Sequence, residues 1–164
     1  MRRTVVGVMG GSVADRETED NAYALGRKIA EHGWVMLNGG RPSGVMAASA
    51  RGAHDGGGLT VGILYDDDLD GAADGIDIVI PTGMGAARNI VNILASDVVV
   101  ACRGSGGTLS EISLALRFGR PVVLLDFDPG EAFLNSAGQG EWFLVATPAE
   151  AVDKVAELLT SLGR

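Results

Sequence analysis

Seven short runs of apolar, largely β-branched residues recur along the chain, and this recurrence constrains the fold more than any other feature. The runs are almost continuously apolar rather than alternating, as in strands whose two faces are both covered. They occupy residues 4–9, 34–37, 59–64, 76–80, 97–102, 121–126 and 142–145. We therefore expect a mainly parallel β-sheet of about seven strands.

Helical patterns lie between most of these runs. In residues 17–32, Ala22, Leu25 and Ile29 fall on one stripe of a helix. Similar spacing occurs in residues 44–54, 84–95, 108–118 and 148–162. Strands that alternate with helices build right-handed crossovers. The chain has 164 residues, 46% of them apolar, which suits one domain with a substantial core. We predict a single doubly wound, Rossmann-like α/β domain over residues 1–164.

Two segments interrupt the alternation. Residues 65–75 are acidic, contain glycine and are too short for a crossover helix, so we expect the strand order to depart there from simple alternation. Residues 127–141 are predicted to form a loop with a short helical turn. The carboxylates of Asp66, Asp67, Asp68 and Asp70 lack a defined ligand spacing, which favours a solvated loop over a metal site.

Charge and cysteine content limit the partners that the chain can have. The formal net charge is −8, so the surface repels the phosphate backbone of nucleic acids at long range. The single cysteine, Cys102, permits no intrachain disulfide and no cysteine-rich metal site. No window approaches the roughly 20 apolar residues of a membrane span. We expect a cytoplasmic protein with a small, enclosed ligand and with no nucleic-acid, membrane or metal partner.

Glycine-rich loops follow four of the predicted strands. In an open parallel sheet, ligands bind at the carboxyl ends of the strands, where such loops lie. Glycine lets backbone N–H groups approach an anion, and the following helix adds the positive end of its dipole. One such loop has a purely steric explanation, but four at one edge favour a phosphate-binding site. The candidate ligand-binding residues are Gly10, Gly11, Ser12, Gly39, Gly40, Arg41, Ser43, Gly44, Gly83, Met84, Arg88, Arg103, Gly104, Ser105, Gly106, Gly107, Thr108 and Glu111.

Glu111 and Arg88 each have two interpretations. Thr108 and Glu111 have the spacing of a capping box, in which Glu111 bonds back to the start of its helix. Alternatively, Glu111 faces the pocket and acts on a ligand hydroxyl or a water molecule. Arg88 lies one turn from Asn92 on a polar face, opposite an apolar stripe that includes Leu94. It is either solvated or a ligand contact, and both side chains can reach one ligand at the same sheet edge.

The glycines at 39, 40 and 44, together with Arg88 and the run Gly104 to Glu111, resemble the Lonely Guy superfamily, whose members are often labelled "possible lysine decarboxylase". The resemblance covers essentially the whole chain. It implies that the glycine motif binds a phosphate and that Arg88 and Glu111 are the catalytic residues of a hydrolase. Arg103-Gly104-Ser105 replaces the family's Pro-Gly-Gly, and Asn89 replaces a lysine. With these departures, the chain resembles the branch of molybdenum cofactor carrier proteins, whose ligand is a phosphate-bearing pterin.

A lysine decarboxylase that uses pyridoxal needs a lysine in its site, and the lysines here, Lys28 and Lys154, lie in predicted helices away from the glycine loops. Our leading hypothesis is a binding or carrier protein for a molybdenum cofactor of the molybdopterin type. The alternative is an enzyme that hydrolyses the N-glycosidic bond of a nucleoside 5′-monophosphate. A third hypothesis is a nucleotide-sensing module without turnover. We also expect a homo-oligomer, most simply a dimer.

Overall fold

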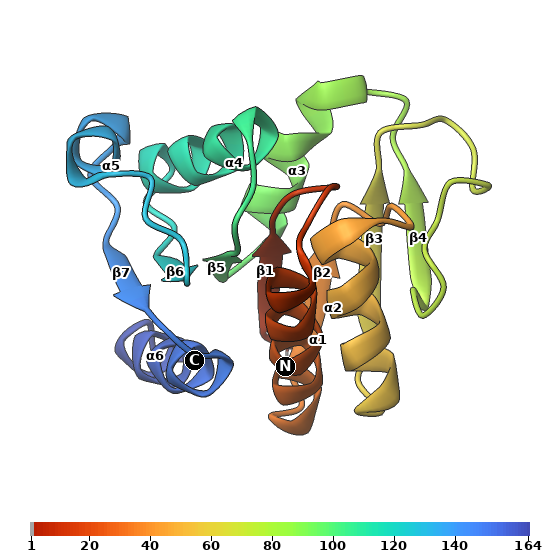
Figure 1. Cartoon of the computed structure of the whole chain (residues 1–164), viewed down its shortest axis with the longest axis horizontal. Helices are drawn as coiled ribbons and strands as arrows, with labels where there is room; N and C mark the ends of the chain where they lie inside the picture. Colours follow the sequence, from red (N-terminus) through yellow and green to blue (C-terminus); the bar gives the residue numbers. More distant parts are fainter. Residues whose placement is uncertain (1) are drawn as a thin grey trace.

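Residues 2–164, which the computed structural model describes, fold around one sheet of seven parallel strands (Figure 1). The strands are β1 (Val5–Met9), β2 (Val35–Asn38), β3 (Thr60–Leu64), β4 (Ile78–Pro81), β5 (Val98–Ala101), β6 (Val122–Leu125) and β7 (Trp142–Val145). Their order across the sheet is β4-β3-β2-β1-β5-β6-β7, and every neighbouring pair is parallel. The predicted Rossmann-like α/β fold is confirmed.

The described residues also form six α-helices and one short 3-10 helix. They are α1 (Arg16–Glu31), α2 (Gly44–Asp55), η1 (Gly85–Arg88), α3 (Asn89–Ala95), α4 (Gly106–Arg117), α5 (Glu131–Ala137) and α6 (Pro148–Ser161). Local sequence explains where two of them begin. The Asp15 side chain accepts a hydrogen bond from the backbone N–H of Thr18 at 2.8 Å and caps α1. Thr147 and Glu150 form a capping box at the start of α6.

Helices cover both faces of the sheet, which explains why the strands are apolar on both sides. On one face, α1, α2 and α6 pack against side chains such as Val8 and Val100. On the other face, α3, α4 and α5 pack against side chains such as Met9 and Val99. Alternate residues of each strand therefore enter two separate apolar cores, one on each side of the sheet.

The winding of the chain reverses between β1 and β5, which are neighbours in the centre of the sheet. From β1 the sheet grows outward through β2, β3 and β4, and from β5 it grows in the opposite direction through β6 and β7. The loops that leave β1 and β5 consequently diverge toward opposite faces. In doubly wound sheets this divergence opens a crevice at the carboxyl ends of the strands.

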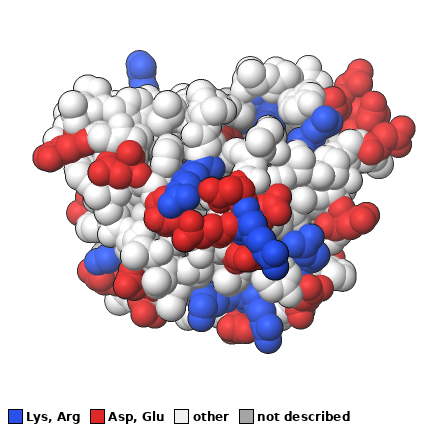
Figure 2. All heavy atoms as spheres, viewed as in Figure 1, with Lys and Arg blue, Asp and Glu red and all other residues white. Residues whose placement is uncertain are grey.

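The β3–β4 connection, residues 65–77, contains no helix, as its sequence suggests. The strand β4 nevertheless remains parallel to β3, with Val61 paired to Ile78. Without a crossover helix, β4 is poorly covered, and Ile78 and Ile80 are 44% and 41% exposed. Acidic side chains gather at the corner of the molecule where this connection lies (Figures 1 and 2).

Two helical predictions need correction. Residues 84–95 begin as the 3-10 helix η1 before α3, and Leu94, predicted to be in the apolar stripe, is 47% exposed. Arg88 and Asn92, predicted to share a polar face, are buried instead, because that face turns toward the crevice. Residues 127–141 contain the seven-residue helix α5, whose Leu134 is buried in the core, so the segment holds a packed helix rather than a loop with a short helical turn.

Candidate functional site

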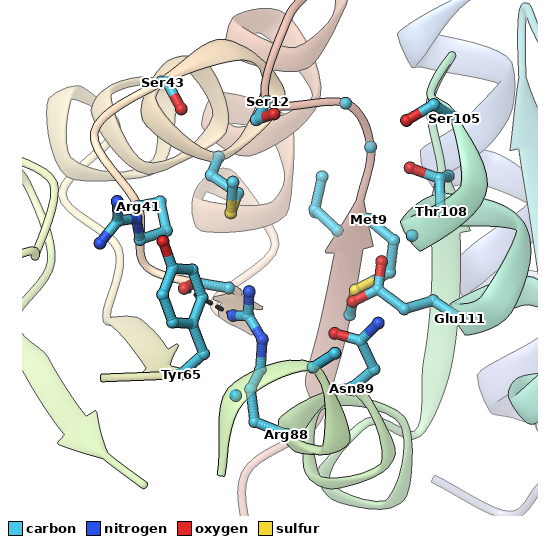
Figure 3. A pocket seen from close by; sticks show the side chains of 18 residues that line it. Met9, Ser12, Arg41, Ser43, Tyr65, Arg88, Asn89, Ser105, Thr108 and Glu111 are labelled. Atoms are coloured by element: carbon cyan, nitrogen blue, oxygen red, sulfur yellow. Dashed lines mark hydrogen bonds between the residues drawn. The ribbon is translucent and has the colours of Figure 1, made fainter. Parts of the chain in front are cut away.

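A cavity of about 650 Å³ opens at the carboxyl ends of the central strands, where the winding of the chain reverses (Figure 3). Its walls come from the loops after β1 and β2, from Tyr65 after β3, and from the start of α4. Asn89, at the start of α3, and Glu111 of α4 form its floor, and η1 adds Arg88 on the side of Tyr65. Small-molecule sites in proteins usually measure about 300–1,000 Å³, so the cavity has the size of a ligand site.

Close backbone approaches explain two of the glycines around this cavity. A Cβ at Gly10 would lie 2.6 Å from a methyl carbon of Val45, and one at Gly104 would lie 2.0 Å from Thr108 Oγ1. These glycines let the loops after β1 and β5 pack directly against α2 and α4. At Gly107, in contrast, a Cβ would meet nothing within 4 Å. The backbone of Gly107 therefore faces open space in the cavity.

The first turn of α4 presents free backbone N–H groups to the cavity wall. Ser105 is the N-cap of α4, and its side chain makes no capping hydrogen bond. The predicted capping box of Thr108 and Glu111 is wrong, because the helix already begins at Gly106 and Glu111 bonds elsewhere. The N-terminus of α4 keeps the unpaired N–H groups and the partial positive charge that favour an anion.

Arg88 lies at the end of η1 and is 8% exposed. Its Nη1 donates hydrogen bonds to the carbonyl oxygens of Gly39 at 2.7 Å and Ile63 at 2.5 Å. The guanidinium therefore joins the ends of β2 and β3, and its remaining edge points into the cavity (Figure 3). Burial lowers the pKa of Arg88 below its ordinary value, although the charge of Glu111 opposes this effect.

Glu111 enters the cavity from α4, on the side opposite Arg88 (Figure 3). It is 8% exposed, and its Oε1 accepts a hydrogen bond from Asn92 Nδ2 at 3.0 Å. Burial raises the pKa of Glu111 to about 7, against the opposing effects of the Asn92 hydrogen bond and the charge of Arg88. Arg88 and Glu111 thus line one cavity, and Glu111 changes its protonation state near neutral pH.

Arg41 and Tyr65 form a wall of the cavity that includes a second cation. The guanidinium carbon of Arg41 lies 4.6 Å from the centroid of the Tyr65 ring, and that of Arg88 lies 5.5 Å from it. Arg41 also donates to Asp66 Oδ2 at 2.7 Å. The aromatic ring stabilises both cations through its quadrupole and holds them on the same wall.

The structure brings most of the predicted site residues together. Those that line the cavity are Gly10, Gly11, Ser12, Gly39, Arg41, Ser43, Arg88, Ser105, Gly107, Thr108 and Glu111. Those that do not line it are Gly40, Gly44, Gly83, Met84, Arg103, Gly104 and Gly106. Gly40 and Gly44 serve backbone packing, since a Cβ would lie 3.1 Å from the Gly62 Cα and 2.2 Å from the Gly11 carbonyl oxygen, respectively.

Arg103 points away from the cavity into a group of carboxylates. Its Nη2 lies 2.6 Å from Asp126 Oδ2, and its Nη1 lies 3.5 Å from Asp15 and 3.6 Å from Glu17. The charge of Asp126 raises the pKa of Arg103. Because its guanidinium forms ion pairs with these carboxylates, Arg103 connects three segments of the chain and does not face a ligand in the cavity.

Five residues that line the cavity were not predicted from the sequence: Val8, Met9, Met46, Tyr65 and Ala86. Asn89, noted as a departure from the family motif, and Gly85, in the glycine loop before η1, also line it. The two methionines carry no signal, because apolar residues in a strand or helix look alike whether they face a core or a ligand. Tyr65 had one available signal. It follows the last residue of a buried strand directly, at the position where parallel sheets place ligand contacts.

Some kinds of site do not occur in the part of the chain that the structure describes. Residues 2–164 contain no group of three or more His, Cys, Asp or Glu side chains placed to hold a metal ion. None of the helices in these residues has both the length and the apolar content of a membrane span.

The fold and the cavity define a Rossmann-like α/β protein with glycine-rich loops around a crevice at the reversal of the sheet. Residues 3–152 match the model of the SLOG cluster4 family, and the chain belongs to this family. The cytokinin riboside 5′-monophosphate phosphoribohydrolase of Mycobacterium tuberculosis is 30% identical over an alignment of 147 positions that covers 80% of this chain and 77% of that protein. The resemblance to the Lonely Guy superfamily is thereby confirmed.

Solved structures of molybdenum cofactor proteins are similar over almost the whole chain. The molybdenum cofactor binding protein of Rippkaea orientalis is 42% identical, with a TM-score of 0.91 over 97% of this chain and 99% of that chain. The molybdenum cofactor carrier protein of Chlamydomonas reinhardtii is 39% identical, with a TM-score of 0.89 and the same coverage of 97% and 99%. The expected resemblance to the carrier branch is confirmed as well.

Proposed function

We propose that this chain is a binding or carrier protein for a phosphate-bearing pterin of the molybdopterin type. The observation that carries the proposal is the cavity, in which the free N–H groups of the α4 N-terminus lie opposite Arg41 and Arg88. An anion is held by such N–H groups, and an extended heterocycle fits within about 650 Å³. The similarity to molybdenum cofactor proteins at 39–42% identity supports this ligand class.

Two features favour carriage over turnover. Arg88, the arginine that the family resemblance places in catalysis, already donates to two backbone carbonyls. Reorienting it toward a reacting group would leave both buried carbonyls unpaired, at a cost of about 1–3 kcal/mol each. In addition, Asn89 stands where the hydrolase motif has a lysine, which removes a positive charge from the cavity floor. A binding protein needs neither a reoriented Arg88 nor a lysine at position 89.

A specific observation supports the alternative of a phosphoribohydrolase. Glu111 has a pKa of about 7 and lines the cavity, and a general acid or base works best when its pKa lies near the working pH. Incubation with AMP and chromatography for free adenine tests this alternative directly. Release of adenine that Glu111→Gln abolishes would establish the hydrolase and exclude a purely binding role.

The carrier proposal is tested by isolating the chain from cells that synthesise molybdenum cofactor. We expect stoichiometric molybdenum by mass spectrometry and a fluorescent oxidised pterin after denaturation. Gly107→Val is expected to reduce both about tenfold or more, because its side chain would enter the open approach to the α4 N–H groups. Ala149→Val, an exposed change in the first turn of α6, is the matched control. Wild-type protein without pterin or molybdenum would contradict the proposal.

A further inference from the structure

Polar atoms next to the cavity floor, and one oxygen of the Glu111 carboxylate in the cavity lining, have no partner within the described residues. Asn92 Oδ1 and Arg88 Nε are buried and make no hydrogen bond within the described residues. Glu111 Oε2 is not fully buried and accepts no hydrogen bond from these residues, while Oε1 accepts one from Asn92 Nδ2. Buried polar groups are nearly always hydrogen-bonded in folded proteins. Asn92 Oδ1 and Arg88 Nε are enclosed by the protein, whereas Glu111 lines the cavity, so a hydrogen-bond donor of a ligand can reach Glu111 Oε2.

The chemistry of the floor is that of a carboxylate beside a carboxamide. Figure 3 shows the side chains of Glu111 and Asn89 pointing toward one another into the cavity, from α4 and α3, respectively. An ionised carboxylate only accepts hydrogen bonds, whereas a carboxamide also donates them. Together they offer two adjacent acceptor positions followed by a donor. Glu111 is also the acidic residue of the lining, while the cations Arg41 and Arg88 belong to the opposite side.

We propose that Glu111 and Asn89 recognise the 2-amino-4-oxopyrimidine edge of the ligand, which pterins and guanine share. This edge presents an amino group, a ring N–H and a carbonyl oxygen in a row, which is the complement of carboxylate plus carboxamide. Glu111 accepts from the amino group and the ring N–H, and Asn89 donates to the carbonyl oxygen. The inference rests on the proposed function and specifies the heterocycle that the cavity selects.

The placement of Glu111 along α4 suits a ligand that reaches both the phosphate loop and the floor. Glu111 follows Gly106 by five residues, which corresponds to about 7.5 Å along the helix axis. A phosphate at the N-terminus of α4 therefore leaves the rest of a nucleotide-sized ligand directed toward Glu111. Adenine does not fit this floor, because its edge offers one amino donor beside a ring nitrogen that only accepts.

Four monophosphates that differ in this edge test the proposal by calorimetry on the full chain. They are GMP, IMP, AMP and neopterin monophosphate. We expect GMP and neopterin monophosphate to bind about 10- to 100-fold more tightly than AMP, with IMP, which lacks the amino group, in between. The ranking of GMP against neopterin monophosphate identifies which heterocycle the cavity prefers. Equal affinity for GMP, IMP and AMP would overturn the inference and leave the proposed phosphate-ligand function standing, whereas no binding of any of the four would contradict that function.

Two variants locate the preference on the floor. Glu111→Gln is expected to weaken the binding of GMP about tenfold or more and to change the affinity for AMP less than about threefold. The reason is that guanine donates two hydrogen bonds to the Glu111 carboxylate, whereas the edge of adenine does not match it. Asn89→Ala is expected to weaken the binding of GMP about fivefold, because the donor to the guanine carbonyl oxygen is lost. Glu141→Gln, an exposed change just before β7 and outside the cavity lining, is the matched control. A GMP preference that survives both floor substitutions in folded protein would place recognition elsewhere.

The pH dependence of binding provides an independent readout. The ionised form of Glu111 is the one that accepts two hydrogen bonds, so GMP affinity should rise between pH 6 and pH 8, across the Glu111 pKa of about 7. The charged group facing Glu111 is Arg88 of η1, which remains protonated over this range, whereas Asn89 and Asn92 of α3 are neutral. The phosphate of both nucleotides also ionises near pH 6, so AMP affinity, and GMP affinity in Glu111→Gln, should rise less over this range than GMP affinity in the wild type.

Discussion

Asn92 of α3 donates a hydrogen bond of 3.0 Å to the carboxylate of Glu111 on the neighbouring helix α4, and both side chains are almost fully buried. This hydrogen bond joins the two helices on either side of β5 in the sequence, which also share an apolar cluster. It fixes the carboxylate at the cavity floor, although one hydrogen bond does not compensate for the loss of hydration of a buried charge. The pKa of about 7 for Glu111 follows from this imbalance.

The first prediction concerns stability and pH. The pKa of Glu111 rises from 4.5 in the unfolded chain to about 7 in the folded protein, so the folded state binds this proton more tightly. The resulting stabilisation is complete below pH 4.5 and is lost as the pH rises to about 7, and it corresponds to about 3 kcal/mol. As the pH is raised from 4.5 to 8, the free energy of unfolding of Glu111→Gln should therefore increase by about 3 kcal/mol relative to that of the wild type.

Urea unfolding of both proteins at the two pH values measures this difference. Comparing the variants cancels the titration of all other groups, provided that they act independently. The exposed Glu141→Gln should show no such relative change. A Glu111→Gln variant whose stability parallels that of the wild type at both pH values would contradict the raised pKa.

The second prediction concerns Arg88 as a structural link. Arg88→Ala removes the donor that serves the carbonyls of Gly39 and Ile63, both of which are buried. We expect the free energy of unfolding to fall by about 2–5 kcal/mol. Arg117→Ala, an exposed change at the end of α4, should cost about 0.5 kcal/mol or less. Equal stability of the two variants in chemical denaturation would show that the Arg88 hydrogen bonds do not hold β2 and β3 together.

The third prediction separates the ring of Tyr65 from its hydroxyl group. The ring faces the guanidinium groups of Arg41 and Arg88, and these contacts need the aromatic surface only. Tyr65→Phe should bind neopterin monophosphate as the wild type does. Tyr65→Leu should bind it about fivefold more weakly, the equivalent of roughly 1 kcal/mol for the loss of cation–π support. Similar weakening by both substitutions would point to the hydroxyl group instead.

The fourth prediction is a homodimer. Leu94 of α3 and Ile80 of β4 are 47% and 41% exposed, and we expect a second copy of the chain to cover them, since two-fold dimers are the commonest soluble oligomers. Light scattering at micromolar concentration should give about twice the mass of one chain. Leu94→Asp should shift the protein toward a monomer, whereas Leu162→Asp, at an equally exposed position after α6, should not. A monomeric wild type would contradict this prediction.

The sequence was sufficient to predict the sheet, because each buried strand is apolar on both faces and that pattern depends on local residues alone. It was also sufficient to place Arg88 and Glu111 at one sheet edge, since topology fixes which loops meet there. The direction of a side chain was harder to predict. Arg103 sits in a glycine loop as Arg41 does, yet carboxylates contributed by α1 and by Asp126 after β6 turn it away from the cavity.

The same limit explains the wrong capping box. Thr108 and Glu111 have the required spacing, as Thr147 and Glu150 do, but only the second pair forms the motif. The hydrogen bond from Asn92, which lies on another helix, decides the position of Glu111. Interactions between residues distant in the sequence override a local signal when they bury the side chain. Tyr65 was overlooked for a related reason, because its neighbours Arg41 and Arg88 come from other loops.

The ion pairs of Arg103 add to the backbone hydrogen bond from Gly11 N–H to the Arg103 carbonyl oxygen in coupling the loops beside the cavity. Asp15 begins α1, Arg103 follows β5 and Asp126 follows β6, so one guanidinium spans three strand ends beside the cavity mouth. A displacement of any one loop stretches contacts to the other two. These pairs are partly exposed, so dissolved ions weaken them. Ligand exchange should consequently accelerate with ionic strength, even for an uncharged ligand whose equilibrium affinity does not change.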